Sequence, residues 1–166
     1  GRKFQVPSVF INLTVEENMI LSLKGHKGIL DSIFHKPGKE ELNEIDRILE
    51  KVGLLDEKET RAGALAHGKK QWLEIAMQIV QKPEIIMLDE PAAGMGKPET
   101  FRTGEILKEI KKDCTIIVIE HDMDFVKQIA DKVTVLHEGK VLMEGDITSV
   151  LADETVQAVY LGRGGE

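Results

Sequence analysis

Two adjacent carboxylates at the end of an apolar run are the residues of this chain best suited to chemistry. Residues 85–91 read IIMLDEP, so Asp89 and Glu90 follow four apolar residues. Such a run predicts a buried parallel strand, and open α/β sheets bind their ligands at the carboxyl ends of their strands. An aspartate there can hold Mg²⁺ through water, and the next carboxylate can orient and activate an attacking water. The alternative is an acidic pair that only caps the next helix.

A histidine follows a second apolar run in the same way. Residues 117–122 read IVIEHD, which predicts another buried strand that ends in a polar turn. His121 is therefore a candidate for polarising or sensing a phosphate group. The alternative is a histidine with a purely structural role.

A third segment predicts an anion site at the start of a helix. Residues 65–76 read LAHGKKQWLEIA, in which a glycine-containing turn opens a helix with an apolar face. The backbone N–H groups of a helix start attract anions, which makes His67, Gly68 and Lys69 candidate nucleotide contacts. The alternative is an ordinary helix start without a ligand.

One further pattern is rejected. Residues 63–69 have the G-x-x-x-x-G-K spacing of a phosphate-binding loop, but Lys70 stands where Ser or Thr would bind Mg²⁺. The pattern also follows a polar loop, whereas a true phosphate loop follows a strand. No other stretch of the chain has this spacing with the required residues.

The elements that must position these residues alternate between strands and helices in the second half of the chain. Strands are predicted over 84–88, 115–119 and 132–136, helices over 97–112, 122–130 and 149–161, and a hairpin turn at 138–140. Strands that alternate with helices indicate a mostly parallel, doubly wound α/β sheet. The hairpin is expected at the edge of that sheet.

The first half of the chain is predicted to be helical. Thr14 and Glu17 have the spacing of a capping box, and residues 40–52 carry apolar residues at helical intervals. Gly53 is placed to end that second helix. We therefore expect a helical insert over residues 8–82 that precedes part of an α/β core.

Composition narrows the function classes. The chain has 166 residues, 42% apolar and 31% charged, with a formal net charge of −7. These values are typical of a soluble globular protein, and the acidic balance argues against a nucleic-acid partner. No stretch approaches the roughly 20 apolar residues that span a bilayer. A role at a membrane would thus require docking onto an embedded partner.

Taken together and in this order, the motifs resemble the nucleotide-binding domain of ABC transporters. Asp89 and Glu90 match the Walker B aspartate and the catalytic carboxylate of that family, and residues 93–96 match its D-loop. Residues 65–69 stand in the place of the LSGGQ signature, and His121 matches the switch histidine. The resemblance implies catalytic roles for Glu90 and His121 and Mg²⁺ coordination by Asp89.

The same resemblance extends to the start of the chain. Gln5 looks like the Q-loop glutamine, which contacts Mg²⁺ or water in the family and signals to the membrane subunit. The resemblance implies a partial P-loop NTPase-like core with a helical insert, and ATP and Mg²⁺ as cofactors. Its implied ranges are 1–7 for the end of a core segment with the Q-loop, 8–82 for the helical subdomain with the signature, and 83–166 for the C-terminal part of the core.

Several positions depart from the family pattern. Ala66 replaces the signature serine, Lys69 replaces the signature glutamine, and Gly96 stands where the D-loop usually carries Asn or Asp. The serine contacts the γ-phosphate held by the opposite subunit, and loss of such a charge-assisted hydrogen bond costs about 1.5–3 kcal/mol. Because the phosphate loop is not found, we expect a truncated chain that is inactive by itself.

The branch of the family can be narrowed by further segments. Residues 88–95, LDEPAAGM, are similar to the ATPases of branched-chain amino acid importers, whereas residues 70–75, 121–126 and 159–163 look more like the urea-transport subset. The resemblance implies the ATP-hydrolysing subunit of such an importer, at the cytoplasmic face of the membrane. It would pair with a second ATPase subunit, identical or different, and with permease subunits. The alternative is a non-catalytic fragment or interaction module that binds no nucleotide.

Overall fold

The computed structural model describes residues 9–23 and 37–161, so Gln5 lies outside the described residues. The chain divides into two compact units, Gly1–Ile119 and Glu120–Glu166, which are described separately. The functional ranges 1–7, 8–82 and 83–166 remain a prediction.

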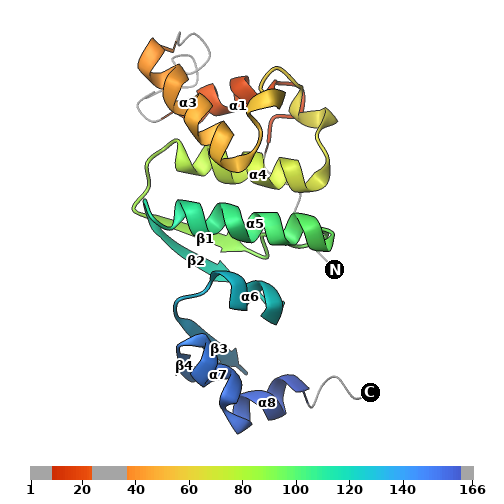
Figure 1. Ribbon diagram of the computed structural model, residues 1–166, viewed down its shortest axis with the longest axis vertical. Helices are drawn as coiled ribbons and strands as arrows, with labels where there is room; N and C mark the ends of the chain where they lie inside the picture. Colours follow the sequence, from red (N-terminus) through yellow and green to blue (C-terminus); the bar gives the residue numbers. More distant parts are fainter. Residues whose placement is uncertain (1–8, 24–36, 162–166) are drawn as a thin grey trace. The chain divides into compact units, whose positions relative to one another are not determined.

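The first unit contains α1 Val15–Leu21, α3 Lys39–Val52, the short 3₁₀ helices η1 Leu55–Glu57 and η2 Ala62–Ala64, α4 His67–Ile79, β1 Ile85–Asp89, α5 Lys97–Ile110 and β2 Thr115–Ile119 (Figure 1). The second contains α6 Met123–Ile129, β3 Val133–His137, β4 Lys140–Gly145, α7 Ile147–Ala152 and α8 Glu154–Leu161.

Local sequence signals set the bounds of the first helices, as predicted. The Thr14 side chain accepts a hydrogen bond from the Glu17 backbone N–H at 3.1 Å, and the Glu17 carboxylate accepts one from the Thr14 N–H at 2.7 Å. This reciprocal capping box satisfies two N–H groups that have no partner within the helix. At the end of α3, Gly53 adopts φ +76°, a left-handed conformation that glycine takes without steric cost.

A helical core forms where the apolar faces of α1, α3 and α4 meet. The residues that α3 buries are Ile45, Ile48, Leu49 and Val52, which confirms the helical spacing read from the sequence. Leu73, Ile75 and Ala76 of α4 are fully buried, as are Val15 and Met19 of α1. Burial of these side chains is the main stabilising contribution to the helical layer.

The strands β1 and β2 form the predicted parallel pair. Their register pairs Ile85 with Thr115 at one end and Asp89 with Ile119 at the other. The Glu90 N–H continues the ladder and donates to the Ile119 carbonyl at 2.9 Å. This register brings the carboxyl ends of both strands to one edge of the sheet.

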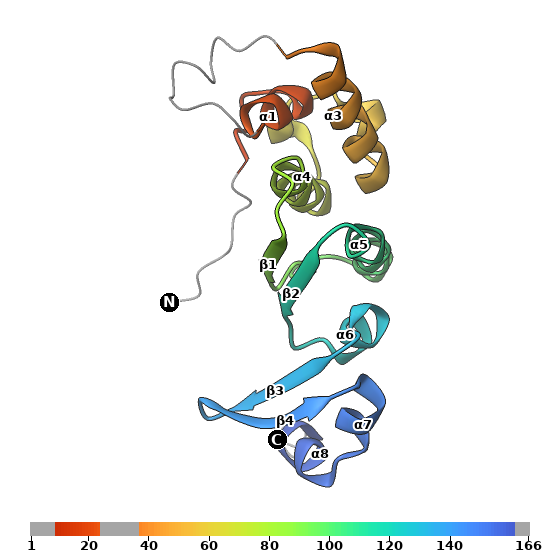
Figure 2. The ribbon, with the colours of Figure 1, turned by 90° about the vertical axis from the view of Figure 1, so that its left-hand side faces the viewer.

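The prediction that β1 is a buried strand is correct for one of its faces and wrong for the other. In β1, Ile86 and Leu88 are buried, but Ile85 is 57% and Met87 68% exposed. Ile119 on β2 is also exposed, at 59%. Successive side chains of a strand point to opposite faces, and among the described residues of this unit α5 covers only one of them (Figure 2). A run of apolar residues predicts a strand, but a face of that strand is buried only where another element packs against it.

The second unit contains the predicted hairpin, but the hairpin is not part of the sheet formed by β1 and β2. β3 and β4 pair antiparallel, with a bulge between Val135 and Leu136, and form a sheet of their own. The third apolar run was expected as a parallel strand of the main sheet, but within the described residues it pairs only with β4. A turn of two residues, with Glu138 and Gly139 both at positive φ, favours this immediate antiparallel return.

The predicted single terminal helix over 149–161 is instead two helices. Asp146 caps α7 by accepting from the N–H groups of Thr148 and Ser149, both at 3.0 Å. Asp153 then interrupts the helix, and its carboxylate accepts from the Val156 N–H at 2.9 Å. Aspartate competes with the helix for backbone N–H groups, so a new cap starts a new helix.

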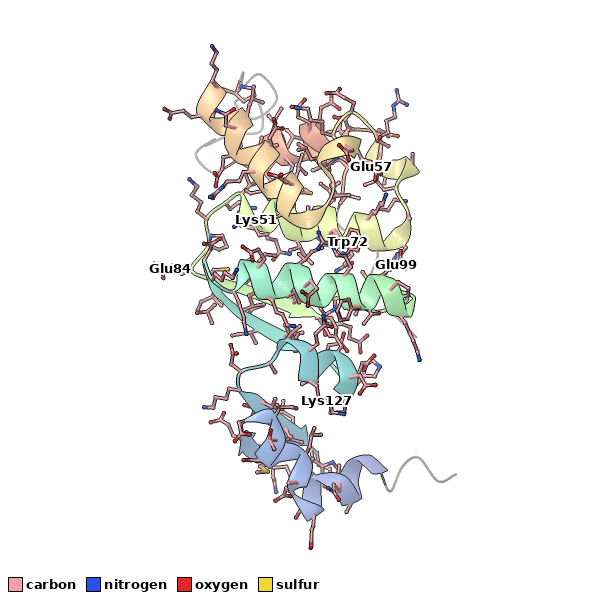
Figure 3. All side chains as sticks on the ribbon, in the orientation of Figure 1. Lys51, Glu57, Trp72, Glu84, Glu99 and Lys127 are labelled. Atoms are coloured by element: carbon pink, nitrogen blue, oxygen red, sulfur yellow. The ribbon has the colours of Figure 1, made fainter. Side chains whose placement is uncertain are left out.

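An ion pair links α3 to the turn before β2. The Lys51 Nζ donates to Asp113 Oδ2 at 2.7 Å, and Lys51 is labelled in Figure 3. This hydrogen bond, together with the lysine charge, lowers the pKa of Asp113 below its ordinary value. A carboxyl with a lowered folded-state pKa stabilises the fold above its unfolded-state pKa, and this stabilisation is lost as the pH falls through the folded-state pKa.

Replacement of Lys51 with Met is expected to raise the pKa of Asp113 toward its ordinary range, because Lys51 is the main cause of the lowering. The substitution keeps the aliphatic stem but removes the donor and the charge. An NMR pH titration of the Asp113 carboxyl carbon would measure the change, with Lys108→Met as the control, because Lys108 pairs with Glu105. An unchanged Asp113 pKa in the Lys51 variant would contradict the assigned cause.

Candidate functional site

The carboxyl end of β1 carries the two acidic residues predicted to bind metal and activate water. Asp89 is the last residue of β1, and Glu90 follows it directly. Both side chains are exposed at the edge where the carboxyl ends of the two parallel strands meet. This is the edge at which open α/β sheets place their ligands.

The backbone at Glu90 has an unusual conformation that its neighbours hold in place. Its φ is +48°, in the left-handed region that costs a residue with a Cβ about 1 kcal/mol or more. The Glu90 N–H donates to the Ile119 carbonyl, and the Glu90 carbonyl accepts from the Ala93 N–H at 3.0 Å. Strained backbone of this kind clusters at functional sites, where surrounding bonds fix the direction of a side chain.

The segment that resembles the signature opens α4, as predicted. Ala66 is the N-cap residue, and no side-chain cap hydrogen bond forms there. A serine at this position would supply one. The first turn of α4 therefore presents backbone N–H groups that its cap residue does not satisfy, and it contains no acidic residue. Such donors suit the oxygen atoms of a phosphate group.

His67 joins the start of α4 to the turn after Glu90. Its Nε2 lies 3.2 Å from the carbonyl oxygen of Ala93. A carbonyl can only accept, so this imidazole nitrogen must carry a proton and donate. A Cβ added at Gly94 would lie 3.6 Å from the same nitrogen, so the ring covers the turn around Gly94. His67 thereby contacts the chain's own D-loop-like segment.

Gly68 allows a close approach between α4 and the first turn of α5. A Cβ at Gly68 would lie 2.9 Å from Glu99 Oε1, which is too short for an ordinary contact. The other oxygen of that carboxylate, Oε2, accepts from the Gly96 N–H at 3.2 Å. The buried Gly68 thus leaves room for the carboxylate that caps α5.

The charge of Lys69 is directed toward the protein's own surface. Its Nζ donates to the carboxylate of Glu57 in η1, and both side chains are about one-third exposed. Glu57 therefore neutralises much of the charge of Lys69, which weakens the attraction of this lysine for a phosphate group.

His121 belongs to the second unit, at the start of α6. Its side chain is 75% exposed, with Nδ1 3.9 Å from Glu120 Oε2. The same Glu120 oxygen accepts from the His121 N–H at 3.0 Å, and Asp122 caps α6 by accepting from the Asp124 N–H at 2.9 Å. These bonds define the backbone around His121, and its side chain lies largely at the surface.

The structure groups the predicted residues into three places. Asp89 and Glu90 lie together at the end of β1, His67, Gly68 and Lys69 lie at the start of α4, and His121 lies in the second unit. Sequence reasoning missed Glu57 and Glu99. Glu99 could have been predicted, because an acidic residue at the N3 position of a helix is a capping signal. The pairing of Glu57 with Lys69 could not, because no local sequence pattern predicts it.

The donor set at β1 suits Mg²⁺ of the kind that accompanies a nucleotide. Within residues 9–23 and 37–161, no three His, Cys, Asp or Glu side chains gather in a way that could hold a metal ion by themselves. Nucleotide-associated Mg²⁺ needs only one or two carboxylates, because phosphates and waters supply its other ligands. In the same described ranges, no helix is long and apolar enough to cross a membrane.

With this geometry in place, comparison with known proteins defines the class. The family model described as ABC transporter matches residues 1–93. The chain belongs to the ABC transporter family, and within that family it is similar to the ATP-binding subunits. Membership in this family implies the use of ATP and Mg²⁺.

The relatives of this chain include ATP-binding proteins of branched-chain amino acid transport. The chain is 35% identical, over 97% of its own length and 67% of the relative's, to the high-affinity branched-chain amino acid transport ATP-binding protein LivG of Salmonella typhimurium and of Escherichia coli. It is 32% identical to BraF of Pseudomonas aeruginosa, which carries the same description, over the same shares. The chain thus spans about two-thirds of these relatives.

Solved structures agree on the fold. The ADP conformation of MJ1267, an ATP-binding cassette of an ABC transporter, matches with a TM-score of 0.74 and 28% identity, over 91% of this chain and 63% of that one. The CbiO1 protein of Clostridium perfringens, part of an ABC transporter complex, matches with a TM-score of 0.73 and 27% identity, over 95% and 61%. The predicted fold class, an ABC ATPase core with a helical insert, is confirmed.

Proposed function

We propose that the protein containing this chain is the ATP-hydrolysing subunit of an ABC importer. The observation that carries this proposal is the exposed Asp89–Glu90 pair at the carboxyl end of a parallel strand, in a chain of this family. Bound Mg²⁺ would screen the phosphate charges of ATP. The chain's own part would be to hold the metal, orient the water and close around the nucleotide.

Each carboxylate is assigned a separate role. Asp89, in line with the strand, would hold the metal through water. Glu90 leaves the line of the strand because of its positive φ, which gives its carboxylate a different direction from that of Asp89. It would accept a proton from the attacking water and orient that water toward the γ-phosphate. His121 is assigned a contact to the γ-phosphate, and Gln5 a contact to the metal or its water.

The start of α4 is assigned to the nucleotide of a second subunit. The N–H groups of its first turn, including those of His67, Gly68 and Lys69, would donate to phosphate oxygens across that interface. Ala66 offers no hydroxyl, and Lys69 is paired with Glu57. Backbone donors and the helix dipole would therefore carry this contact, which predicts weaker engagement than a signature with serine and glutamine gives.

Branched-chain amino acids are the solute class that we favour. Support comes from the descriptions of LivG and BraF, which are branched-chain amino acid transport ATP-binding proteins. Urea is the second candidate, because of the resemblance of residues 70–75, 121–126 and 159–163. The proposed partners are a second ATPase subunit and membrane-embedded permease subunits, with this subunit on the cytoplasmic face.

A calorimetric titration with MgATP tests the proposal. The protein of natural length that contains this chain is expected to bind saturably at or below millimolar nucleotide, and Asp89→Ala is expected to weaken Mg²⁺-dependent binding at least tenfold, that is by about 1.4 kcal/mol or more. The control is Asp113→Ala, which removes an exposed carboxylate just before the amino end of β2. Absence of binding in the unsubstituted protein would contradict the proposal and favour an interaction module without nucleotide.

A further inference from the structure

A buried carboxylate next to His121 has no part in the roles proposed above. The side chain of Glu120 is only 4% exposed, whereas that of His121 is 75% exposed. Glutamate is almost never fully buried unless its oxygen atoms have hydrogen-bond partners. The partners of Glu120 therefore indicate why this carboxylate lies inside the protein.

The Glu120 carboxylate binds two backbone N–H groups of the residues that follow it. Its Oε2 accepts from the His121 N–H at 3.0 Å and from the Asp122 N–H at 3.4 Å. Because β2 ends at Ile119 and α6 begins at Met123, both donors lie in the connection between a strand and a helix. Backbone N–H groups outside regular structure need a side chain or water as acceptor. Glu120 supplies that acceptor.

Asp122 holds the other end of the same connection. Its Oδ1 accepts from the N–H groups of Asp124 at 2.9 Å and of Phe125 at 3.2 Å. Phe125 is 1% exposed and is among the largest fully buried side chains, so α6 is held by a buried ring close to its start. His121 thus stands between two acidic residues that each bind two backbone N–H groups, one of which is its own.

Glu120 acts on the backbone of His121 and does not hydrogen-bond its imidazole ring. His121 Nδ1 lies 3.9 Å from Glu120 Oε2, beyond the roughly 2.7–3.2 Å of an N–H···O hydrogen bond. The bond from the His121 N–H instead restricts rotation of the backbone at His121. It therefore restricts the direction in which the side chain of this histidine leaves the chain.

We propose that Glu120 is a positioning residue for His121. The functional consequence rests on the proposed ATPase function, in which His121 contacts the γ-phosphate. Glu120 keeps residues 120–122 in one conformation, so the ring of His121 meets the phosphate without first reorganising the backbone. Glu120 itself is not placed in contact with nucleotide. Its loss should therefore affect turnover only through His121.

Amide hydrogen exchange tests the structural part, without nucleotide and in the protein of natural length. Glu120→Ala removes the acceptor, so the amides of His121 and Asp122 should exchange about tenfold faster. Glu120→Gln keeps an acceptor oxygen and should exchange at the parental rate. The Val150 amide, which donates to the Asp146 carbonyl at 3.0 Å in the same unit, reports on general stability and should not change.

The matched control is Glu138→Ala. Glu138 is also adjacent to a histidine, with its Oε1 4.0 Å from His137 Nε2, but its side chain is 82% exposed. This variant should exchange and hydrolyse ATP as the parent protein does.

A double-mutant cycle tests the functional part. Glu120→Ala should lower kcat for MgATP hydrolysis about tenfold, and Glu120→Gln should recover most of it. In a protein that already carries His121→Ala, the further change Glu120→Ala should alter kcat by no more than about twofold. A residue that only stabilises the fold would lower kcat by the same factor in both backgrounds.

A second variant covers the case in which Glu120→Ala does not fold. In Glu120→Ser, the hydroxyl can accept from the N–H two residues further on, that of Asp122, but leaves the His121 N–H without its acceptor. Only the His121 amide should then exchange faster, and kcat should again fall.

Several results would overturn the proposal. They are unchanged exchange at His121, equally faster exchange at Val150, an equal loss of kcat with and without His121, or parental turnover in His121→Ala alone. If the parent protein hydrolyses no ATP, the proposed function fails, and the exchange pattern still decides whether Glu120 holds the connection.

Discussion

Replacement of Glu90 with Gln is expected to lower kcat for ATP hydrolysis about 10²- to 10⁴-fold while MgATP binding persists. The amide keeps the size and hydrogen-bonding reach of the carboxylate but cannot accept a proton from water. The backbone bonds that hold Glu90 at φ +48° do not involve its side chain, so the substitution should leave the local fold unchanged. Phosphate release at saturating MgATP, measured in the protein of natural length, gives the rate.

The matched control is Glu84→Gln, which makes the same chemical change just before the opposite end of β1. Glu84 is exposed, and its carbonyl, which is unaffected by the substitution, accepts from the Thr115 N–H at 3.0 Å. We expect parental turnover in this variant. Undiminished turnover in Glu90→Gln would remove Glu90 from the catalytic role, whereas loss of MgATP binding would indicate a role in holding the metal or the nucleotide.

Replacement of Leu49 with Ala is expected to lower the free energy of unfolding by about 2–5 kcal/mol. Leu49 is fully buried where α3 packs in the helical core, so the truncation removes apolar burial and leaves a cavity. Loss of this size is a large part of the 5–15 kcal/mol that stabilises a typical domain. Equilibrium unfolding in urea, followed by circular dichroism, measures it.

The control for Leu49 is Leu42→Ala on the same helix. Both substitutions change helix propensity equally, but Leu42 is only half-buried, so its loss should cost about 1 kcal/mol. Equal costs at the two positions would show that burial against α4 and α1 is not the source of the stability. The comparison therefore isolates the contribution of packing from that of propensity.

Features that depend on neighbouring residues could be predicted from the sequence, whereas burial by distant elements could not. The capping box at Thr14, the glycine stop at Gly53 and the strand just before Glu90 were predicted because each depends on residues within a few positions of one another. The burial of Ile85 and Met87 was predicted wrongly, because an apolar residue in a strand is buried only if another element covers its face. Gln5 lies outside the described residues, so its role remains a prediction.

By itself, then, the sequence predicted the strands, the hairpin, most of the helices and the order of motifs that marks an ABC ATP-binding chain, but not the division of the last helix into two. Only the tertiary structure decided which side chains meet: Lys69 with Glu57, 12 residues apart, His67 with Ala93, 26 apart, and Trp72 with Thr103, 31 apart. Helical periodicity and capping can be recognised from residues close together in the sequence, because backbone hydrogen bonds in helices and turns are local. Contacts between helices depend on how whole faces pack, and a single local pattern is compatible with many packings.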